Sequence, residues 1–120
     1  MTYDEIKSVL NMVDSPADKL EMVMDIGAHA PAVPGGAICG DIIGCASHVE
    51  ICRVGNRFYG RADSAIVRGI VAIITAMVDG KSVAEIKQMD LGAEFASLNL
   101  PLGAGRLNGV NSMISFLQNL

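Results

Sequence analysis

Apolar residues recur at helical spacing near the start of the chain. Between positions 3 and 13 they occupy one helical face, at Ile6, Val9, Leu10 and Val13, as in an amphipathic helix. Thr2, followed three residues later by Glu5, has the capping-box pattern. A second helix start is indicated at Ser15-Pro16, because serine is a good cap and proline suits the first helical position. The pattern therefore predicts helices over residues 3–13 and 16–29.

Prolines and glycines then interrupt this spacing. Residues 31–36 contain two prolines and two glycines, which predict a connector without helix. From residue 48 apolar and polar residues alternate, which predicts a strand over 48–54, a tight turn at Gly55-Asn56 and a returning strand over 57–62. Basic and polar residues take every second place in the returning strand, so one face of this hairpin should meet water.

The segment over residues 65–78 is apolar nearly all round, which predicts a buried central helix with Asp63 or Ser64 as its cap. Ser82 predicts a short helix over 83–88, and the glycines and proline that follow predict an irregular segment. A last helix is predicted over 107–120. These elements indicate an α+β fold in which a small antiparallel, hairpin-based sheet carries helices on one face.

Length and composition narrow the picture further. A chain of 120 residues, 51% of them hydrophobic, is expected to form a single domain, 1–120. A net charge of −4 argues against nucleic acid as the partner. The most apolar stretch, residues 66–78, contains Arg68 and is too short to cross a bilayer, and the N-terminus lacks a signal-peptide pattern. We therefore expect no membrane association and a cytoplasmic protein with reduced cysteines.

Basic residues are unevenly distributed. No Lys or Arg falls between Lys19 and Arg53, after which Arg57, Arg61 and Arg68 follow closely. A solvated sheet face explains this cluster, and so does half of a charge-complementary docking surface. Both interpretations stay open.

The candidate chemistry centres on Cys45, which directly follows Gly44 in the segment before the first predicted strand. Glycine allows backbone conformations closed to other residues, so the thiol can be held outward on a loop. Four interpretations compete: a nucleophilic sulfur, a metal or cluster site, a redox pair with Cys39 or Cys52 as the resolving thiol, and structural burial. Zinc sites usually contain cysteines two to four residues apart, a spacing absent here, and Cys52 in mid-strand best suits the structural interpretation.

Other polar residues lie close to this cysteine in the sequence or at helix ends. His48, three residues from Cys45, would stabilise a thiolate or relay a proton, or would simply face solvent. Asp63 is expected to cap the central helix, with a role near the thiol as the second interpretation. Arg106 opens the last helix, where a lone cation opposes the helix dipole, so we expect it to pair with a carboxylate or with carbonyl groups.

Four segments, in order, resemble motifs of the SufE family, the SufE/CsdE-like sulfur acceptors of cysteine desulfurases. Ile42–Ser47 is similar to the family's V-x-G-C-x-S, and Gly60–Ala72 to its G-x-S-D-A-x-I-V-K-G-L-x-A. Asp25–Gly27 followed by Pro31 is similar to its ELG…LP pattern, and Arg106–Val110 to the R-x-N-G-L of its closing helix. The chain departs from the family in having His48-Val49-Glu50 after the motif serine, where Gln-Val-Trp is usual, and in its additional thiols Cys39 and Cys52.

The resemblance implies a SufE/IscU-like fold and a function in sulfur transfer. Cys45 would accept persulfide sulfur from a SufS/CsdA-like cysteine desulfurase and relay it towards a downstream iron–sulfur cluster scaffold. Gly44, Ser47, His48, Asp63 and Arg106 are the predicted supporting residues. The resemblance implies no cofactor and no metal, and an accessory protein rather than a stand-alone enzyme.

Two alternatives remain at this point. The first is an IscU-like scaffold that binds a metal or cluster through Cys39, Cys45, Cys52 and His48. The second is a regulatory partner that activates a desulfurase by docking, with Cys45 dispensable.

Overall fold

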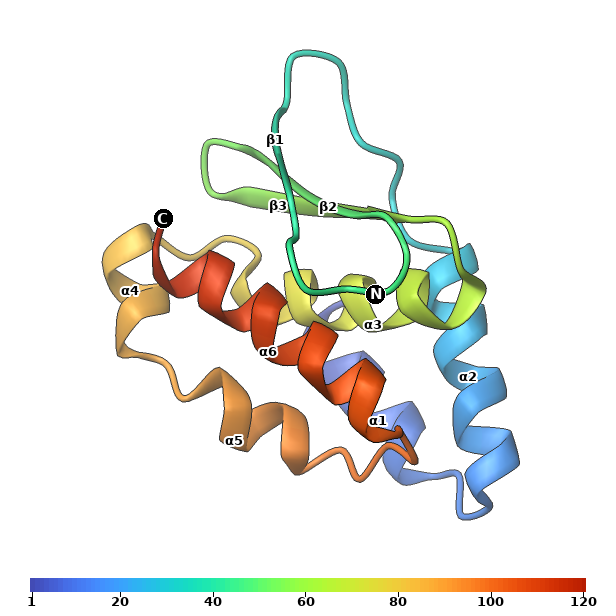
Figure 1. Ribbon diagram of the computed structural model, residues 1–120. Helices are drawn as coiled ribbons and strands as arrows, with labels where there is room; N and C mark the ends of the chain where they lie inside the picture. The colour runs from blue at the N-terminus through green and yellow to red at the C-terminus, as the bar shows by residue number, and fades with distance from the viewer.

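A computed structural model describes all 120 residues as six helices and a three-stranded antiparallel sheet. The elements follow in the order α1 (Tyr3–Asn11), α2 (Pro16–Ala28), β1 (Ile38–Asp41), β2 (Val49–Val54), β3 (Arg57–Ala62), α3 (Ala65–Val78), α4 (Val83–Gln88), α5 (Leu91–Ala96) and α6 (Ala104–Gln118). Figure 1 shows the helices gathered on one side of the sheet, which confirms the predicted α+β class. No helix is both long and apolar enough to cross a membrane.

Hydrogen bonds from side chains fix the helix starts that the sequence indicated. The Thr2 hydroxyl accepts a hydrogen bond from the Glu5 amide at 3.2 Å, and the Glu5 carboxylate accepts one from the Thr2 amide at 2.9 Å. The Ser15 hydroxyl caps α2 by accepting a hydrogen bond from the Asp18 amide at 3.0 Å. At the start of α3 the cap is Ser64, whose hydroxyl accepts from the Val67 amide at 3.3 Å. Asp63, the other predicted cap, makes no such contact.

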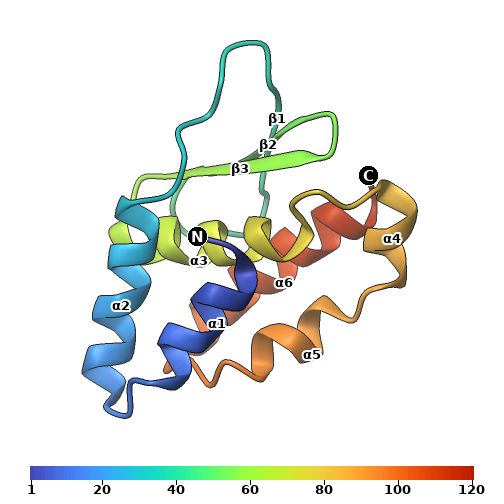
Figure 2. The same cartoon turned by 180° about the vertical axis from the view of Figure 1, so that it is seen from behind.

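The central helix α3 is surrounded by the rest of the chain, as Figure 2 shows from behind. Eight of its residues are buried, and six of them belong to one hydrophobic cluster of 23 residues. Helix α2 crosses it at Gly27 and Gly69, where a Cβ added to Gly27 would lie only 2.5 Å from the Gly69 nitrogen. Two glycines are therefore needed at this crossing, and the crossing holds α2 and α3 in backbone contact.

Strand β2 is the middle strand and pairs with both neighbours. Because side chains alternate along a strand, Val49 and Ile51 face the helices and are buried, whereas Glu50 and Cys52 face the other way. Opposite them on β1 stand Asp41 and Cys39 respectively. We call the side of the sheet that bears these four residues its outer face.

Four elements differ from the prediction. No strand was predicted before residue 48, whereas residues 38–41 form β1, a four-residue edge strand that is mostly exposed and whose formation depends on pairing with β2. Helix α5 was expected to be irregular, because its six residues contain Gly92. Helix α6 begins at Ala104 rather than at residue 107, and α1 ends at Asn11 rather than at residue 13.

Candidate functional site

The loop that carries Cys45 connects β1 to β2. Its base is closed by the Ile42 amide, which donates to the Val49 carbonyl at 2.9 Å, and by the Ile42 side chain, which is buried. Gly44 has φ +101°, a conformation that strongly favours glycine. A Cβ there would also lie 2.6 Å from the Ser112 hydroxyl of α6. Two features therefore require glycine before the cysteine, as predicted: the backbone conformation and the close approach to α6.

The Cys45 thiol lies against α6 at Gly109, where the helix has no side chain. Its Sγ lies 3.8 Å from the Gly109 carbonyl oxygen, to which it donates a weak hydrogen bond, and the residue is half-buried. A Cβ added to Gly109 would lie 3.1 Å from this sulfur. Gly109 was not among the predicted site residues. It lies in the segment that resembles the family's R-x-N-G-L, which is the signal that could have identified it.

A pocket of about 280 Å³ opens beside the thiol. Its lining comes from the Cys45 loop, from the start of α3 and from the first three turns of α6: Cys45, Ala46, Ser47, Ser64, Val67, Ile70, Gly105, Arg106, Gly109 and Met113. Two of the predicted supporting residues, Ser47 and Arg106, are therefore brought to the cysteine. The pocket is large enough to hold an additional sulfur atom on the Cys45 thiol.

Burial raises the pKa of the Cys45 thiol above its ordinary value, because the pocket wall removes water that would solvate a thiolate. No ion pair opposes this effect. Arg106 is exposed at the start of α6 and forms neither an ion pair nor a hydrogen bond, so its expected pairing with a carboxylate or carbonyl group is wrong. In the free protein Cys45 is therefore mostly in its protonated thiol form.

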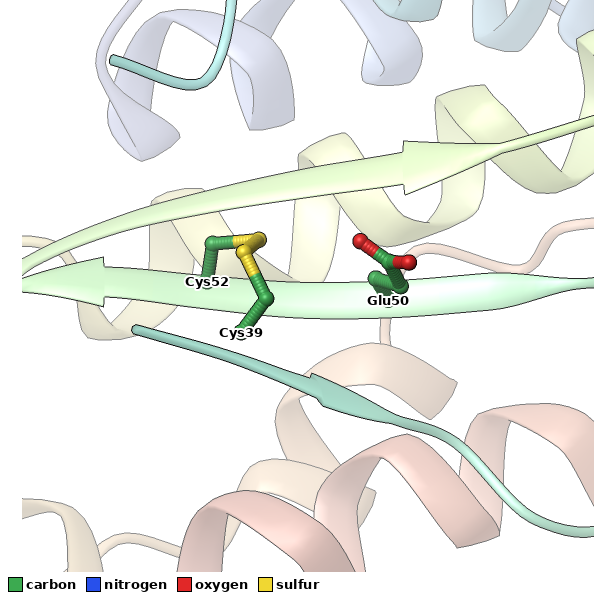
Figure 3. A group of neighbouring side chains, drawn as sticks. All are labelled: Cys39, Glu50 and Cys52. Atoms are coloured by element: carbon green, nitrogen blue, oxygen red, sulfur yellow. A yellow bond between two sulfur atoms is a disulfide. The ribbon is translucent and has the colours of Figure 1, made fainter. Parts of the chain in front are cut away.

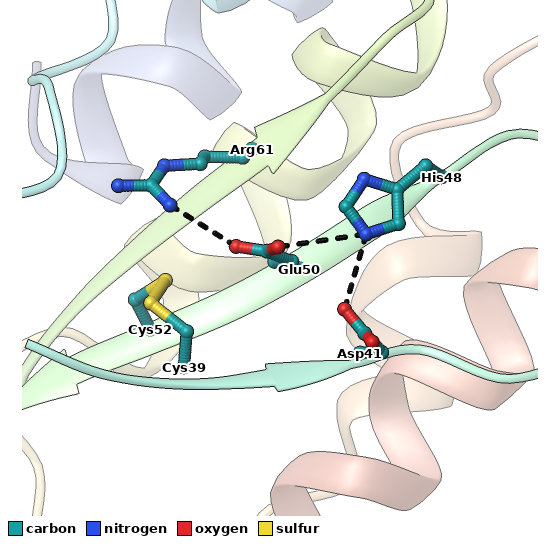
Figure 4. Close-up of polar contacts among 6 residues, drawn as sticks. All are labelled: Cys39, Asp41, His48, Glu50, Cys52 and Arg61. Atoms are coloured by element: carbon teal, nitrogen blue, oxygen red, sulfur yellow. Dashed lines mark hydrogen bonds and ion pairs between the residues drawn. A yellow bond between two sulfur atoms is a disulfide. The ribbon is translucent and has the colours of Figure 1, made fainter.

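His48 turns away from the cysteine. Its Nε2 lies 3.1 Å from Asp41 Oδ1 and 3.5 Å from Glu50 Oε1, on the outer face (Figure 4). The hydrogen bond to Asp41, followed by the nearby carboxylate charges, raises the pKa of His48. Asp63 lines a separate hollow together with His48 rather than the Cys45 pocket. These two predicted supporting residues therefore lie at the base of the loop and do not contact the thiol.

Cys39 and Cys52 form a disulfide between β1 and β2 (Figure 3). The expectation that all cysteines are thiols is therefore wrong, and so is the pairing of Cys45 with either of them: the register places Cys39 directly opposite Cys52. Cys45 is the one free cysteine. The four-residue metal set of the scaffold alternative is not assembled, because Cys45 contacts α6 while the other three residues lie on the sheet or at its end.

Comparisons with known proteins match nearly the whole chain. The family model described as SufE, Fe-S metabolism associated domain, matches residues 4–120. An uncharacterised SufE-like protein of Rhizobium meliloti is 31% identical, with 94% of this chain and 89% of the relative covered. The sulfur acceptor protein CsdE of Escherichia coli is 28% identical, over 94% of this chain and 83% of that protein.

A solved structure supports the same fold. The solution structure of a hypothetical protein from Thermus thermophilus has a TM-score of 0.67 and 13% sequence identity, and the match covers 99% of this chain and 94% of that one. The family match and the relative at 31% identity show that the chain belongs to the SufE family.

Proposed function

We propose that this SufE-family chain accepts a persulfide sulfur on Cys45 from a cysteine desulfurase and relays it towards iron–sulfur cluster assembly. The partner would be of the SufS/CsdA-like type and the recipient a downstream iron–sulfur scaffold. In this role the chain acts as an accessory protein, because the persulfide that it accepts is formed on the desulfurase. The observation that carries the proposal is the single free thiol, held on a loop over a pocket lined by Ser47 and Arg106.

The transfer step is a thiol exchange. The Cys45 thiolate attacks the outer sulfur of the desulfurase persulfide, and a new S–S bond forms on Cys45. The old S–S bond breaks, and the desulfurase cysteine leaves as a thiolate. No electrons enter or leave the pair, and no further oxidant is needed. The same exchange, repeated with a thiolate of the next acceptor, passes the sulfur on.

The resting site needs a partner to make it reactive. The thiol is half-buried and its pKa is raised, so in free solution little thiolate is present to react with small oxidants. No amide of residues 43–48 donates a backbone hydrogen bond, so the loop can leave α6 at low cost. We expect docking to draw the loop out and to lower the pKa of Cys45 by placing it beside the partner's polar active site.

The surface around the thiol supports docking of a protein. Ile43, two residues before Cys45, is 84% exposed, and Leu107 next to Arg106 is 43% exposed. Each lies two residues before a group at the thiol, Cys45 or Gly109, so exposed apolar surface is available near the site for a docking protein. The arginine cluster is less available than the sequence suggested, since Arg57 and Arg61 form ion pairs with Asp79 and Glu50.

Intact-mass measurement after incubation with a cysteine desulfurase and L-cysteine tests this function. We expect the wild type to gain about 32 Da, one sulfur atom, and to lose it on treatment with a thiol reductant. Cys45→Ser should gain nothing. Cys39→Ser is the matched control, because it also removes one cysteine but should still gain sulfur.

Two results would count against the proposal. Sulfur gain in Cys45→Ser would place the acceptor elsewhere in the chain. Full stimulation of the desulfurase by Cys45→Ala, without any sulfur gain by the wild type, would favour the regulatory alternative.

The proposal includes the expected cytoplasmic location, since a reducing compartment preserves a free acceptor thiol.

A further inference from the structure

Two cysteines and two carboxylates form a rectangle on the outer face of the sheet. Cys39 stands opposite Cys52, and Asp41 stands opposite Glu50. Since residues two apart on a strand share a face, all four side chains project from the same surface, away from α3 and α6. His48 adds an imidazole at one end of the rectangle, within 3.5 Å of Glu50.

The potential ligand atoms form two compact groups that overlap at one residue. A sulfur from each cysteine and a carboxylate oxygen of Glu50 all lie within 4.8 Å of one another, as do atoms of Asp41, His48 and Glu50. Glu50 belongs to both sets, so it joins them. Ligand atoms around tetrahedral zinc stand about 3.3 to 3.8 Å apart, given bond lengths of about 2.0 to 2.3 Å. Each group is thus compact, and a four-ligand set would combine the two cysteines and Glu50 of the first group with His48 of the second.

Neighbouring residues already orient the central carboxylate. Arg61 donates to Glu50 Oε2 at 3.2 Å, while Oε1 points towards His48 (Figure 4). A ligand carboxylate held at its other oxygen is the arrangement that tunes metal sites. Cys52 is fully buried, the Glu50 side chain is 20% exposed and the His48 side chain is 54% exposed, so the site has a closed floor and an open entrance.

We propose that this outer face binds one Zn²⁺ when the Cys39–Cys52 disulfide is reduced. The ligands are the two cysteine thiolates, the Glu50 carboxylate and His48 Nε2. Thiolate, imidazole and carboxylate ligands in a tetrahedral set select zinc over magnesium or calcium, which require oxygen ligands. Asp41 stays beside His48 as an additional negative charge. Cys45 is not a ligand, so the site is separate from the proposed sulfur transfer.

Conversion of the disulfide form into the zinc form balances in electrons and protons. A dithiol reductant supplies two electrons and two protons, the S–S bond breaks, and the reductant becomes a disulfide. Zinc then binds the two cysteines and their two protons pass to solvent. Disulfide and zinc are thus alternative cross-links between the same two strands. In a reducing compartment the bound metal would hold β1 against β2 in place of the disulfide. It would thereby also hold the base of the Cys45 loop.

Cobalt titration of the full-length chain tests the site. The protein is reduced with a phosphine, stripped of metal with a chelator and titrated with Co²⁺, whose thiolate charge-transfer and tetrahedral d–d absorption report the ligands. We expect one Co²⁺ per reduced chain, released by one equivalent of Zn²⁺. The disulfide form should show no thiolate–cobalt absorption. Absence of stoichiometric absorption in the reduced wild type would overturn the proposal.

Variants locate the metal. Cys39→Ser changes an exposed residue and should abolish most of the charge-transfer absorption, and Cys45→Ser, the matched single-cysteine variant, should leave it unchanged. Glu50→Gln keeps shape and both cysteines, and should weaken Zn²⁺ binding by about ten- to a hundredfold, the range found even for groups that only orient ligands. Loss of binding in Cys45→Ser, or unchanged affinity in Glu50→Gln, would contradict the assignment even if Cys39→Ser were to unfold.

Discussion

The two ends of the β1–β2 hairpin carry the same element, sulfur, in opposite circumstances. At the base, Cys39 and Cys52 face each other across paired strands and are joined. At the tip, Cys45 has no sulfur partner and rests against Gly109 of α6. The base is held by strand pairing and a disulfide, and the tip by contact with a helix more than sixty residues away in the chain. The difference shows that a cysteine's role follows from what the fold places opposite it.

The two sulfur sites are nevertheless linked. The disulfide joins residues 13 apart in sequence, and the ring that it closes contains Cys45. The His48–Asp41 contact closes the same ring nearer the tip. Any change at the base therefore alters the anchorage of the loop, whereas the tip can move without breaking the base. The predictions below separate these two behaviours.

Reduction of the disulfide should have the largest effect. In the presence of a chelator, loss of a cross-link that closes a loop of this length should lower the free energy of unfolding by roughly 3 kcal/mol. Cys45→Ser should change it by less than about 1 kcal/mol, because the thiol is half-buried and makes one weak hydrogen bond. Urea unfolding with and without reductant measures both. Equal losses would mean that the tip is as structural as the base.

Hydrogen exchange should divide the hairpin in the same way. Amides of residues 43–48, which donate no backbone hydrogen bonds, should exchange at least about tenfold faster than those of β2, a difference equal to about 1.4 kcal/mol of opening free energy. Mass spectrometry of peptic fragments would resolve the two segments. Protection of residues 43–48 as strong as that of α3 would exclude the loop motion on which docking depends.

Alanine substitutions one helical turn apart, at Gly105 and Gly109, should show whether the contact with α6 sets the reactivity of Cys45. A Cβ at Gly109 would press on Cys45 Sγ, whereas a Cβ at Gly105 would meet nothing within 4 Å. We expect Gly109→Ala to push the thiol outward, lower the pKa of Cys45 and speed its alkylation at neutral pH roughly threefold, since thiolate fraction follows pKa. Iodoacetamide kinetics across pH measure this effect.

Gly105→Ala is the matched control for that substitution. It lines the same pocket and gains the same helix propensity, so it should leave the alkylation rate unchanged. Similar rates in the two variants would show that the Gly109 gap does not set the reactivity of the cysteine.

The smallest expected effect concerns the His48–Asp41 contact, which lies between the base and the tip. The Asp41 hydrogen bond raises the pKa of His48 above its usual 6.5. Because the folded-state pKa is the higher one, protonated His48 stabilises the hairpin at pH values below 6.5, and this contribution is lost as the pH rises through the raised pKa. Proton NMR titration should give a lower His48 pKa in Asp41→Asn. A higher pKa in that variant would rule out Asp41 as the cause.

Much of the fold could be predicted because local chemistry determines it. Helix α3 has the predicted bounds, as does α4 behind its Ser82 capping box, and the β2–β3 hairpin turns at the expected Gly55-Asn56. Strand β1 could not be predicted, because four mostly exposed residues carry no periodic signal and exist as a strand only when β2 is beside them. Helix α5 contains a glycine that suggested a break.

For the site, the sequence by itself determined which cysteine stands out: Cys45, after a glycine that the loop requires, within a motif that resembles those of the family. Tertiary structure decided the rest. It joined Cys39 to Cys52, turned His48 away towards Asp41 and Glu50, and placed Gly109 beneath the thiol. The physical reason is that backbone conformation is a local property of a few residues, whereas the neighbours of a side chain depend on strand register and helix packing between distant segments.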